Sequence, residues 1–203
     1  MKIICIGRNY ADHIAELKNE RPDEPVIFTK PDTALLRDND PFYYPDYTKE
    51  VHHELEVVLR ICKEGKFIQP EFAHNYYDQI GLGIDFTARD LQTKAKQKGL
   101  PWAIAKGFNG AAPVSKFFPV SEIEDIQNLD FRLLVNGEER QAGNTSLMLW
   151  PVKELLAYVS QFFTLKIGDL IFTGTPKGVG EVKVGDRLEG FIAERKLLDF
   201  EIK

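Results

Sequence analysis

The sequence predicts an α+β domain that is mostly β. Apolar runs with the length and composition of strands outnumber helical segments, and the two kinds do not alternate strictly along the chain, as they would in a doubly wound sheet. Asn136-Gly137 lies between two such runs and is a strong signal for a hairpin turn. At 203 residues the chain has the length of one domain, and we expect 1–203 to fold as one unit.

Each element is expected from a local pattern. Strands are expected at apolar runs bounded by turn residues, which are 3–6, 26–29, 51–62, 79–86, 130–135, 138–142, 169–173 and two runs within 187–202. Helices are expected at 8–17, at 70–78 with proline in the first turn, at 87–98 with Thr87 as N-cap, and at 151–163, where apolar residues recur at helical spacing. Residues 19–25 and 38–49 are expected to be loops, and 102–106 a short extended segment.

Composition argues against several classes of function. The net charge is −5 and no basic stripe is present, so nucleic acid is not an expected partner. No apolar run approaches the length of a membrane span, and the N-terminal segment turns polar too soon for a signal peptide, so a cytoplasmic location is expected. Cys5 and Cys62 lie in separate apolar runs without a metal or redox spacing, and we expect both to be buried and reduced.

Two carboxylates lie two residues apart in the strand predicted over 51–62. Side chains alternate along a strand, so Glu54 and Glu56 would share a face with His52. A Glu-x-Glu pair alone usually marks a solvated face, but the apolar residues around these acids indicate a strand covered on both sides. Buried together, the two acids would repel each other unless a cation lay between them.

A third acid extends this pair. Asp85 lies in another apolar run, 79–86. With Glu54 and Glu56 it would form an all-oxygen site suited to a hard divalent cation, Mg²⁺ before Mn²⁺ or Ca²⁺. The three acids therefore predict metal-assisted chemistry on a small, oxygen-rich substrate.

Other polar residues occur at spacings that could serve catalysis. His13 and Glu16 are neighbours on a helix, where the carboxylate could orient the imidazole as a general base. Arg89 and Gln92 have the same spacing and could donate hydrogen bonds to an oxyanion. Lys106, within an apolar stretch, would need an acidic partner or a ligand. Taken alone, each pattern also fits a solvated helix or a lysine that extends into water.

The glycine-rich segment 174–180 is a candidate ligand loop. It lacks the Walker spacing, so a nucleotide site is not expected. Its glycines would allow a ligand to approach the backbone closely, with the Thr175 hydroxyl as a donor. No Gly-x-Ser-x-Gly elbow is present, which argues against a serine-hydrolase triad.

Taken together, these segments resemble the fumarylacetoacetate hydrolase family over nearly the whole chain. The segments that carry the resemblance are Gly7-Arg-Asn-Tyr-Ala-Asp-His-Ile-Ala-Glu16, His52-His-Glu-Leu-Glu56, 83–92, 98–102, 105–107, 135–137 and 173–180. Each segment is weak evidence alone, whereas all of them in this order form a highly specific signal.

The resemblance implies a multilayered β-sandwich roll with short flanking helices, as in the short, single-domain members, and a homodimer. It implies Mg²⁺ or Mn²⁺ on Glu54, Glu56 and Asp85. Around the substrate it places Arg89, Gln92, Lys106, Thr175, Arg8 and Gly174. His13 and Glu16 match the lid dyad of the members that cleave acylpyruvates, and Asn109 stands where many relatives carry Asp.

The implied activity is metal-dependent hydrolysis of the C3–C4 bond of a 3-acylpyruvate, a 2-oxo acid, through a pyruvate enolate that the metal stabilises. His13, oriented by Glu16, would activate the water. The same enolate arises in decarboxylation or tautomerisation of oxaloacetate and in isomerisation of 2-hydroxyhepta-2,4-diene-1,7-dioate, so these activities are alternatives at one site. A catalytically silent metal-binding subunit is a further alternative, although it would not need Lys106 or Arg89.

Overall fold

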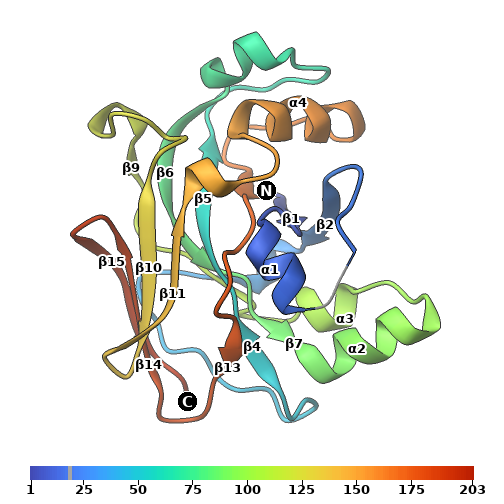
Figure 1. Cartoon of the computed structure of the whole chain (residues 1–203), viewed down its shortest axis with the longest axis vertical. Helices are drawn as coiled ribbons and strands as arrows, with labels where there is room; N and C mark the ends of the chain where they lie inside the picture. The colour runs from blue at the N-terminus through green and yellow to red at the C-terminus, as the bar shows by residue number, and fades with distance from the viewer. Residues whose placement is uncertain (18–19) are drawn as a thin grey trace.

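The described residues, 1–17 and 20–203 of this computed structural model, form four β-sheets flanked by short helices (Figure 1). The largest sheet has, in spatial order, β2 (Val26–Lys30), β1 (Ile3–Gly7), β12 (Leu170–Phe172), β5 (Leu55–Ile61), β6 (Tyr77–Ile84) and β9 (Phe118–Pro119). The second has β11 (Glu138–Asn144), β10 (Asp130–Val135), β14 (Arg187–Ile192) and β15 (Arg195–Glu201). The predicted mostly β, α+β class is confirmed.

Small sheets and helices complete the fold. One small sheet has the order β13 (Gly180–Glu181), β4 (Val51–His53) and β7 (Thr87–Ala88), and the other pairs β3 (Leu35–Leu36) with β8 (Ala112–Pro113). The α-helices are α1 (Ala11–Glu16), α2 (Arg89–Lys98), α3 (Ala103–Lys106) and α4 (Val152–Phe162). The 3-10 helices are η1 (Asp32–Ala34), η2 (Pro70–Asn75), η3 (Val120–Glu122) and η4 (Thr145–Leu147).

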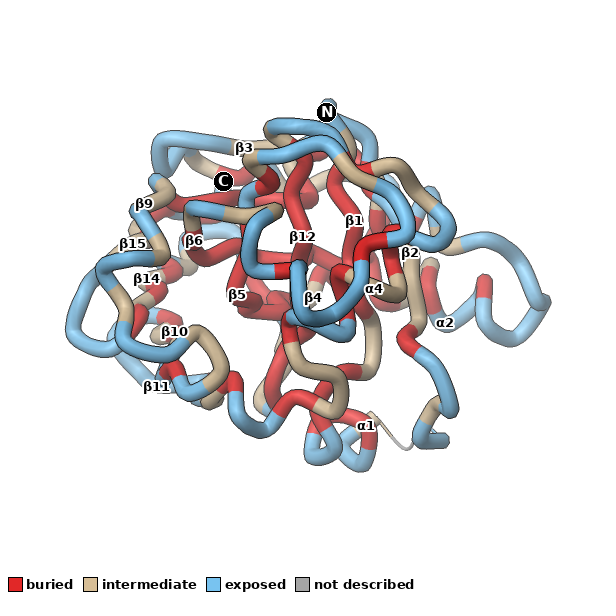
Figure 2. The backbone as a smooth tube through the Cα atoms, turned by 90° about the horizontal axis from the view of Figure 1, so that it is seen from above, coloured by how far each residue is buried: buried red, intermediate tan, exposed pale blue. Residues whose placement is uncertain are grey.

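The largest sheet is covered on both faces, which explains its continuous apolar strands. In β1, Ile3 and Cys5 join one buried cluster, which includes residues of β10, β14 and β15. Ile4 and Ile6 point the other way, into a second cluster with the apolar stripe of α4. Figure 2 shows β1, β12 and β5 as the buried centre of the molecule. The second sheet and α4 are therefore outer layers around one central sheet.

The hairpin predicted from Asn136-Gly137 is confirmed. The turn joins β10 to β11, with Val135 paired to Glu138. Both turn residues have positive φ, 55° at Asn136 and 80° at Gly137, as a two-residue hairpin turn that follows the strand twist requires.

Three local predictions need correction. The strand expected over 51–62 is interrupted at Glu54, because β4 pairs with β13 and β7 whereas β5 pairs with β12 and β6. Residues 102–106 are helical rather than extended: the Lys106 amide donates to the Trp102 carbonyl at 2.9 Å, and alanine favours this turn. Thr87 lies in β7, and Ala88 is the N-cap of α2.

Other expectations have mixed outcomes. The segment 70–78 contains a 3-10 helix, and the loop expected over 19–25 lies partly outside the described residues. Both cysteines are free; Cys5 is buried but Cys62 is only half-buried. Among the described helices, none combines the length and apolarity that crossing a membrane requires.

Candidate active site

Three buried acids converge where β5 begins and β6 ends. Glu54 lies in the break between β4 and β5, Glu56 is in β5, and Asp85 follows β6. The antiparallel pairing of Leu55 with Ile84 brings these strand ends together. One carboxylate oxygen from each acid lies within 4.8 Å of the others. The structure thus gathers the acids that the sequence pattern selected.

Two of these acids already have cationic partners. Glu54 accepts from Arg89 at 2.5 Å and from Lys106 at 2.8 Å, and Lys106 also donates to Asp85 at 2.7 Å. Burial opposes ionisation of Glu54, but the Lys106 and Arg89 charges outweigh it and hold the pKa of Glu54 well below its usual range. Burial likewise opposes the charge on Lys106, whose pKa is nevertheless raised by Asp85 and Glu54.

Glu56 has the opposite electrostatic balance. Burial and the Asp85 charge raise the pKa of Glu56 well above its usual range, against a hydrogen bond from the Gly174 amide at 2.7 Å. Among the described residues, no lysine, arginine or histidine lies within 4 Å of it. Asp85 Oδ1 is buried and accepts no hydrogen bond. Its ion-pair partner is Lys30, whose Nζ lies 2.7 Å away. A hard divalent cation would offset the repulsion between Glu56 and Asp85, so the residues fit Mg²⁺ or Mn²⁺.

Lys30 is a buried cation behind the acids that the sequence reasoning missed. Its ammonium donates to the carbonyls of Phe86 at 3.1 Å, Lys106 at 2.5 Å and Ala111 at 2.9 Å. These bonds use its three N–H groups, and Asp85 Oδ1 lies 2.7 Å away as a charge partner. The one available signal was a lysine directly after an apolar strand-like run, which by itself is common.

We expect Lys30→Met to lower the free energy of unfolding by about 3–5 kcal/mol. The substitution removes one partner of a buried ion pair and leaves three carbonyls without their hydrogen-bond donor. Urea denaturation of the metal-free protein measures this. Lys153→Met, on the exposed face of α4, is the matched control and should change stability by less than about 0.5 kcal/mol. Equal stability of the two variants would contradict the structural role of Lys30.

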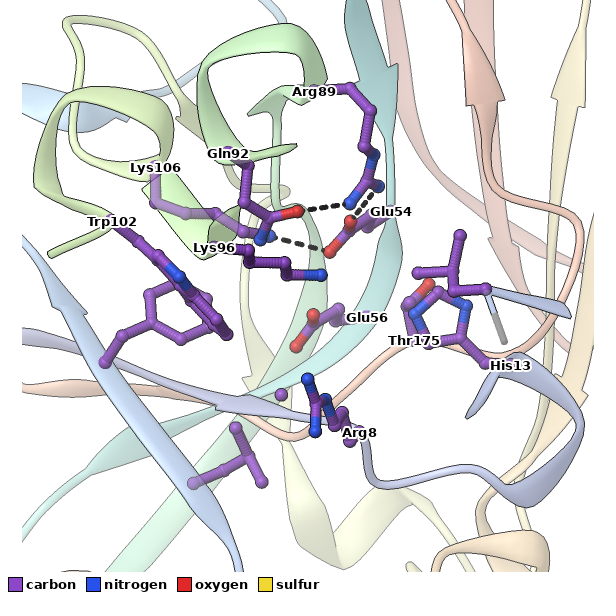
Figure 3. A pocket seen from close by; sticks show the side chains of 14 residues that line it. Arg8, His13, Glu54, Glu56, Arg89, Gln92, Lys96, Trp102, Lys106 and Thr175 are labelled. Atoms are coloured by element: carbon purple, nitrogen blue, oxygen red, sulfur yellow. Dashed lines mark hydrogen bonds and ion pairs between the residues drawn. The ribbon is translucent and has the colours of Figure 1, made fainter. Parts of the chain in front are cut away.

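Helix α2 supplies two further polar side chains. Arg89 and Gln92 are both buried, and Arg89 Nη1 donates to Gln92 Oε1 at 2.6 Å. Arg89 Nε also donates to His52 Nδ1 at 3.4 Å, so His52 lies beside the arginine. With its oxygen engaged by Arg89, Gln92 keeps its amide N–H groups for the pocket that it lines. Arg89 therefore joins Glu54 and Gln92 in one network (Figure 3).

Helix α1 carries the predicted dyad. His13 Nδ1 lies 3.2 Å from Glu16 Oε2, and Glu16 Oε1 accepts the Gly178 amide at 2.9 Å. His13 is buried and lines the same pocket as the acids. Asn9 fixes the start of this helix: its side chain donates to the Thr173 carbonyl at 2.8 Å and accepts the Trp150 amide at 2.9 Å. The imidazole is thus held by one nitrogen, which leaves the other to exchange a proton.

The glycine-rich segment contributes a donor and a close approach. Gly174 has φ of 103°, and a Cβ there would lie 2.7 Å from the Cβ of Asn9, so only glycine fits without displacing the backbone. Thr175 lines the pocket, and its Oγ1 accepts from Gln141 at 2.8 Å. The hydroxyl hydrogen is therefore directed elsewhere. Gln141, which also accepts the Leu55 amide, carries no sequence signal of its role.

One pocket collects most of the side chains described above (Figure 3). They are Glu54, Glu56, Arg89, Gln92, Lys106, His13 and Thr175. Lys96, Trp102 and Phe28 also line it, and the sequence reasoning did not assign Lys96 or Phe28 to the site. Lys96 lies seven positions after Arg89 and four after Gln92, which places the three on one face of α2. That helical spacing was the signal that could have identified Lys96.

Two other residues singled out in the sequence have different outcomes. Arg8 lines the pocket, with a φ of 60° that is uncommon for a residue other than glycine. Asn109, which stands where the resemblance implies Asp in many relatives, does not line this pocket. It lies in a separate groove with Phe42 and Tyr47.

Comparison with known proteins places this geometry in context. Residues 2–201 match the family described as fumarylacetoacetate (FAA) hydrolase C-terminal. The chain is 44% identical to "Oxaloacetate tautomerase FAHD1, mitochondrial" of Bos taurus over 99% of this chain and 91% of that protein. It is 43% identical to "Oxaloacetate decarboxylase, mitochondrial" of Dictyostelium discoideum, over 91% of this chain and 85% of that protein.

A solved structure supports the same relationship. Fumarylpyruvate hydrolase from Pseudomonas aeruginosa, crystallised in complex with Mn²⁺ and pyruvate, superposes with a TM-score of 0.94 and 36% identity. The match covers 100% of this chain and 89% of that one. The multilayered architecture is therefore the one that the sequence resemblance implied.

Proposed function

Because the chain belongs to the fumarylacetoacetate hydrolase family, we propose that it is a divalent-metal-dependent enzyme that interconverts the keto and enol forms of oxaloacetate. The proposal rests mainly on one observation: three buried acids lie together, and two of them, Glu54 and Glu56, line a pocket with the donors Lys106 and Arg89. The choice of oxaloacetate is supported by the two relatives named for that acid. Among the candidate reactions, tautomerisation is also the simplest, because it moves one proton and breaks no carbon–carbon bond.

The residues of this chain would bind and polarise the 2-oxo acid. A bound Mg²⁺ or Mn²⁺ would supply Lewis-acid polarisation of the 2-oxo group. Thr175, whose oxygen is occupied by Gln141, would donate its hydrogen to the substrate carboxylate. Lys106 and the free amide of Gln92 would donate to the oxygen on which negative charge develops. One such donor contributes about 10²–10³ in rate.

The His13–Glu16 pair would move the proton. Glu16 holds Nδ1 of the imidazole, so Nε2 would remove the C3 proton of the keto form and deliver it to the oxygen on C2, which gives the enol. The reverse transfer would return the keto form. The Gly178 amide fixes Glu16 in turn. Because α1 carries the imidazole, closure of this helix over the pocket would exclude bulk water from the proton transfer.

The same dyad favours hydrolysis of 3-acylpyruvates as a second function. There His13 would take a proton from water that attacks the distal carbonyl, and Lys106, Gln92 and Arg89 would stabilise the oxyanion. The P. aeruginosa fumarylpyruvate hydrolase, a structural neighbour at 36% identity, supports this candidate.

The two functions can be separated with purified protein. We expect the enol form of oxaloacetate to disappear faster with protein plus Mg²⁺ or Mn²⁺ than with the metal alone, and EDTA to remove the difference. Release of pyruvate from oxaloacetate and loss of the diketone absorbance of acylpyruvates should be measured in parallel. If the protein does not accelerate enol loss, the tautomerase proposal is overturned. If it consumes acylpyruvate faster than it consumes the enol of oxaloacetate, hydrolysis becomes the main function.

A further inference from the structure

The pocket carries more positive than negative side chains. Its charged lining consists of four cationic residues and two acids, Arg8, Arg89, Lys96, Lys106, Glu54 and Glu56. Arg89 and Lys106 are already engaged by Glu54. A divalent cation at the acids would add two further positive charges. The pocket is therefore suited to a substrate that carries more than one negative charge.

Lys96 lies at the mouth of the pocket, and the proposed mechanism does not use it. It is exposed, its ammonium lies 5.5 Å from the centroid of the Trp102 ring, and among the described residues no carboxylate lies within 4 Å. Loss of hydration and the Arg89 and Arg8 charges lower the pKa of Lys96 to about 8. Figure 3 shows its side chain directed into the pocket. A lysine held among other cations is stabilised when an anion joins it.

Arg8 faces the same space from another element. It follows β1 and reaches the pocket from a backbone with φ of 60°. A residue with a side chain adopts this left-handed conformation at a cost, and such residues concentrate at functional sites. In Figure 3 its guanidinium points toward the pocket. Lys96 and Arg8 thus bring two cations, from α2 and from the segment that follows β1, to one cavity.

We propose that Lys96, with Arg8, forms a second anion subsite that selects 2-oxo acids carrying a distal carboxylate over those with an uncharged tail. This inference rests on the proposed function, because it assumes that the 2-oxo carboxylate end is bound at the acids and Thr175. The distal carboxylate would then lie toward the mouth of the pocket. Trp102 would hold the lysine stem and limit its freedom, since cation–π contact favours one position of the ammonium.

Substrate pairs test this selection directly. Oxaloacetate carries the distal carboxylate, and acetylpyruvate carries a methyl ketone in its place. We expect Lys96→Met to raise KM for oxaloacetate about 10-fold, with kcat nearly unchanged, and to alter KM for acetylpyruvate less than about 2-fold. Lys96→Arg should restore most of the preference. Lys94→Met, on the same helix but exposed and away from the pocket, is the matched control.

Two results would overturn the subsite. One is an equal loss of kcat/KM on both substrates, which would assign Lys96 to folding or to general binding. The other is unchanged kinetics in Lys96→Met, or the same change in Lys94→Met.

A binding measurement distinguishes failure of the subsite from failure of the proposed function. N-oxalylglycine mimics a 2-oxo acid with a distal carboxylate, and N-methyloxamate is its counterpart with an uncharged tail. With Mg²⁺ present, we expect a larger thermal shift from the first ligand in wild type, and loss of that excess in Lys96→Met. If this holds while every turnover assay fails, the subsite stands and the proposed function falls. Equal shifts from both ligands in wild type would contradict the subsite.

Discussion

Glu56→Gln is expected to raise the melting temperature of the metal-free protein and to abolish stabilisation by Mg²⁺. The raised pKa of Glu56 means that burial and the Asp85 charge oppose its ionised form. Glutamine removes that charge and keeps an oxygen to accept the Gly174 amide. It is also a far poorer ligand, so we expect metal affinity to fall at least about 100-fold. Thermal unfolding with and without Mg²⁺ measures both effects.

Glu56→Gln is informative because its two expected effects are opposite: the metal-free protein gains stability, whereas the stabilisation by Mg²⁺ is lost. Glu71→Gln, an exposed acid in η2, controls for the loss of one negative charge and should change neither the melting temperature nor its response to Mg²⁺. If Glu56→Gln destabilised the metal-free protein, repulsion within the acid cluster would be refuted. If it kept the full Mg²⁺ response, Glu56 would not be a ligand.

His13→Ala is expected to separate the reactions that share the site. Hydrolysis of acylpyruvates and tautomerisation of oxaloacetate both need a proton moved by His13, so each should fall by about 10²–10⁴. Decarboxylation of oxaloacetate breaks a carbon–carbon bond without a water nucleophile and should be largely retained. Rates of all three reactions, measured on one preparation with saturating Mg²⁺, give the comparison.

His74→Ala, an exposed histidine in η2, is the matched control and should leave all three rates unchanged. The rates of hydrolysis and tautomerisation in Glu16→Gln should lie between those of wild type and His13→Ala, because this substitution weakens the hold on the imidazole without removing the ring. Equal retention of hydrolysis and decarboxylation in His13→Ala would refute the proton-transfer role of the dyad.

The acid cluster could be predicted because its information is local. Glu54 and Glu56 are separated by the two-residue period of a strand, and their apolar neighbours indicated a buried segment, although Glu54 itself lies in the break between β4 and β5. Asp85 completes the group because β5 and β6 are antiparallel neighbours. The hairpin at Asn136-Gly137 and helix α4 followed equally from nearby residues.

What could not be predicted depends on contacts between distant parts of the chain. Lys30 pairs with Asp85 across 55 positions, and Gln141 reaches Thr175 across 34. The interruption at Glu54 arises because β4 and β5 join different sheets. Lys96 is different, since helical spacing linked it to Arg89 and the sequence contained the signal.

The most direct test is whether the acids hold one metal ion that coordinates a 2-oxo acid. Mn²⁺ binding can be measured through the electron paramagnetic resonance signal of the free ion. We expect one ion per chain in wild type, tighter binding when oxalate is added, and no binding in the variant Glu54→Gln/Glu56→Gln/Asp85→Asn. An ion that binds this variant equally well, or whose affinity in wild type ignores oxalate, would contradict a metal centre built by Glu54, Glu56 and Asp85.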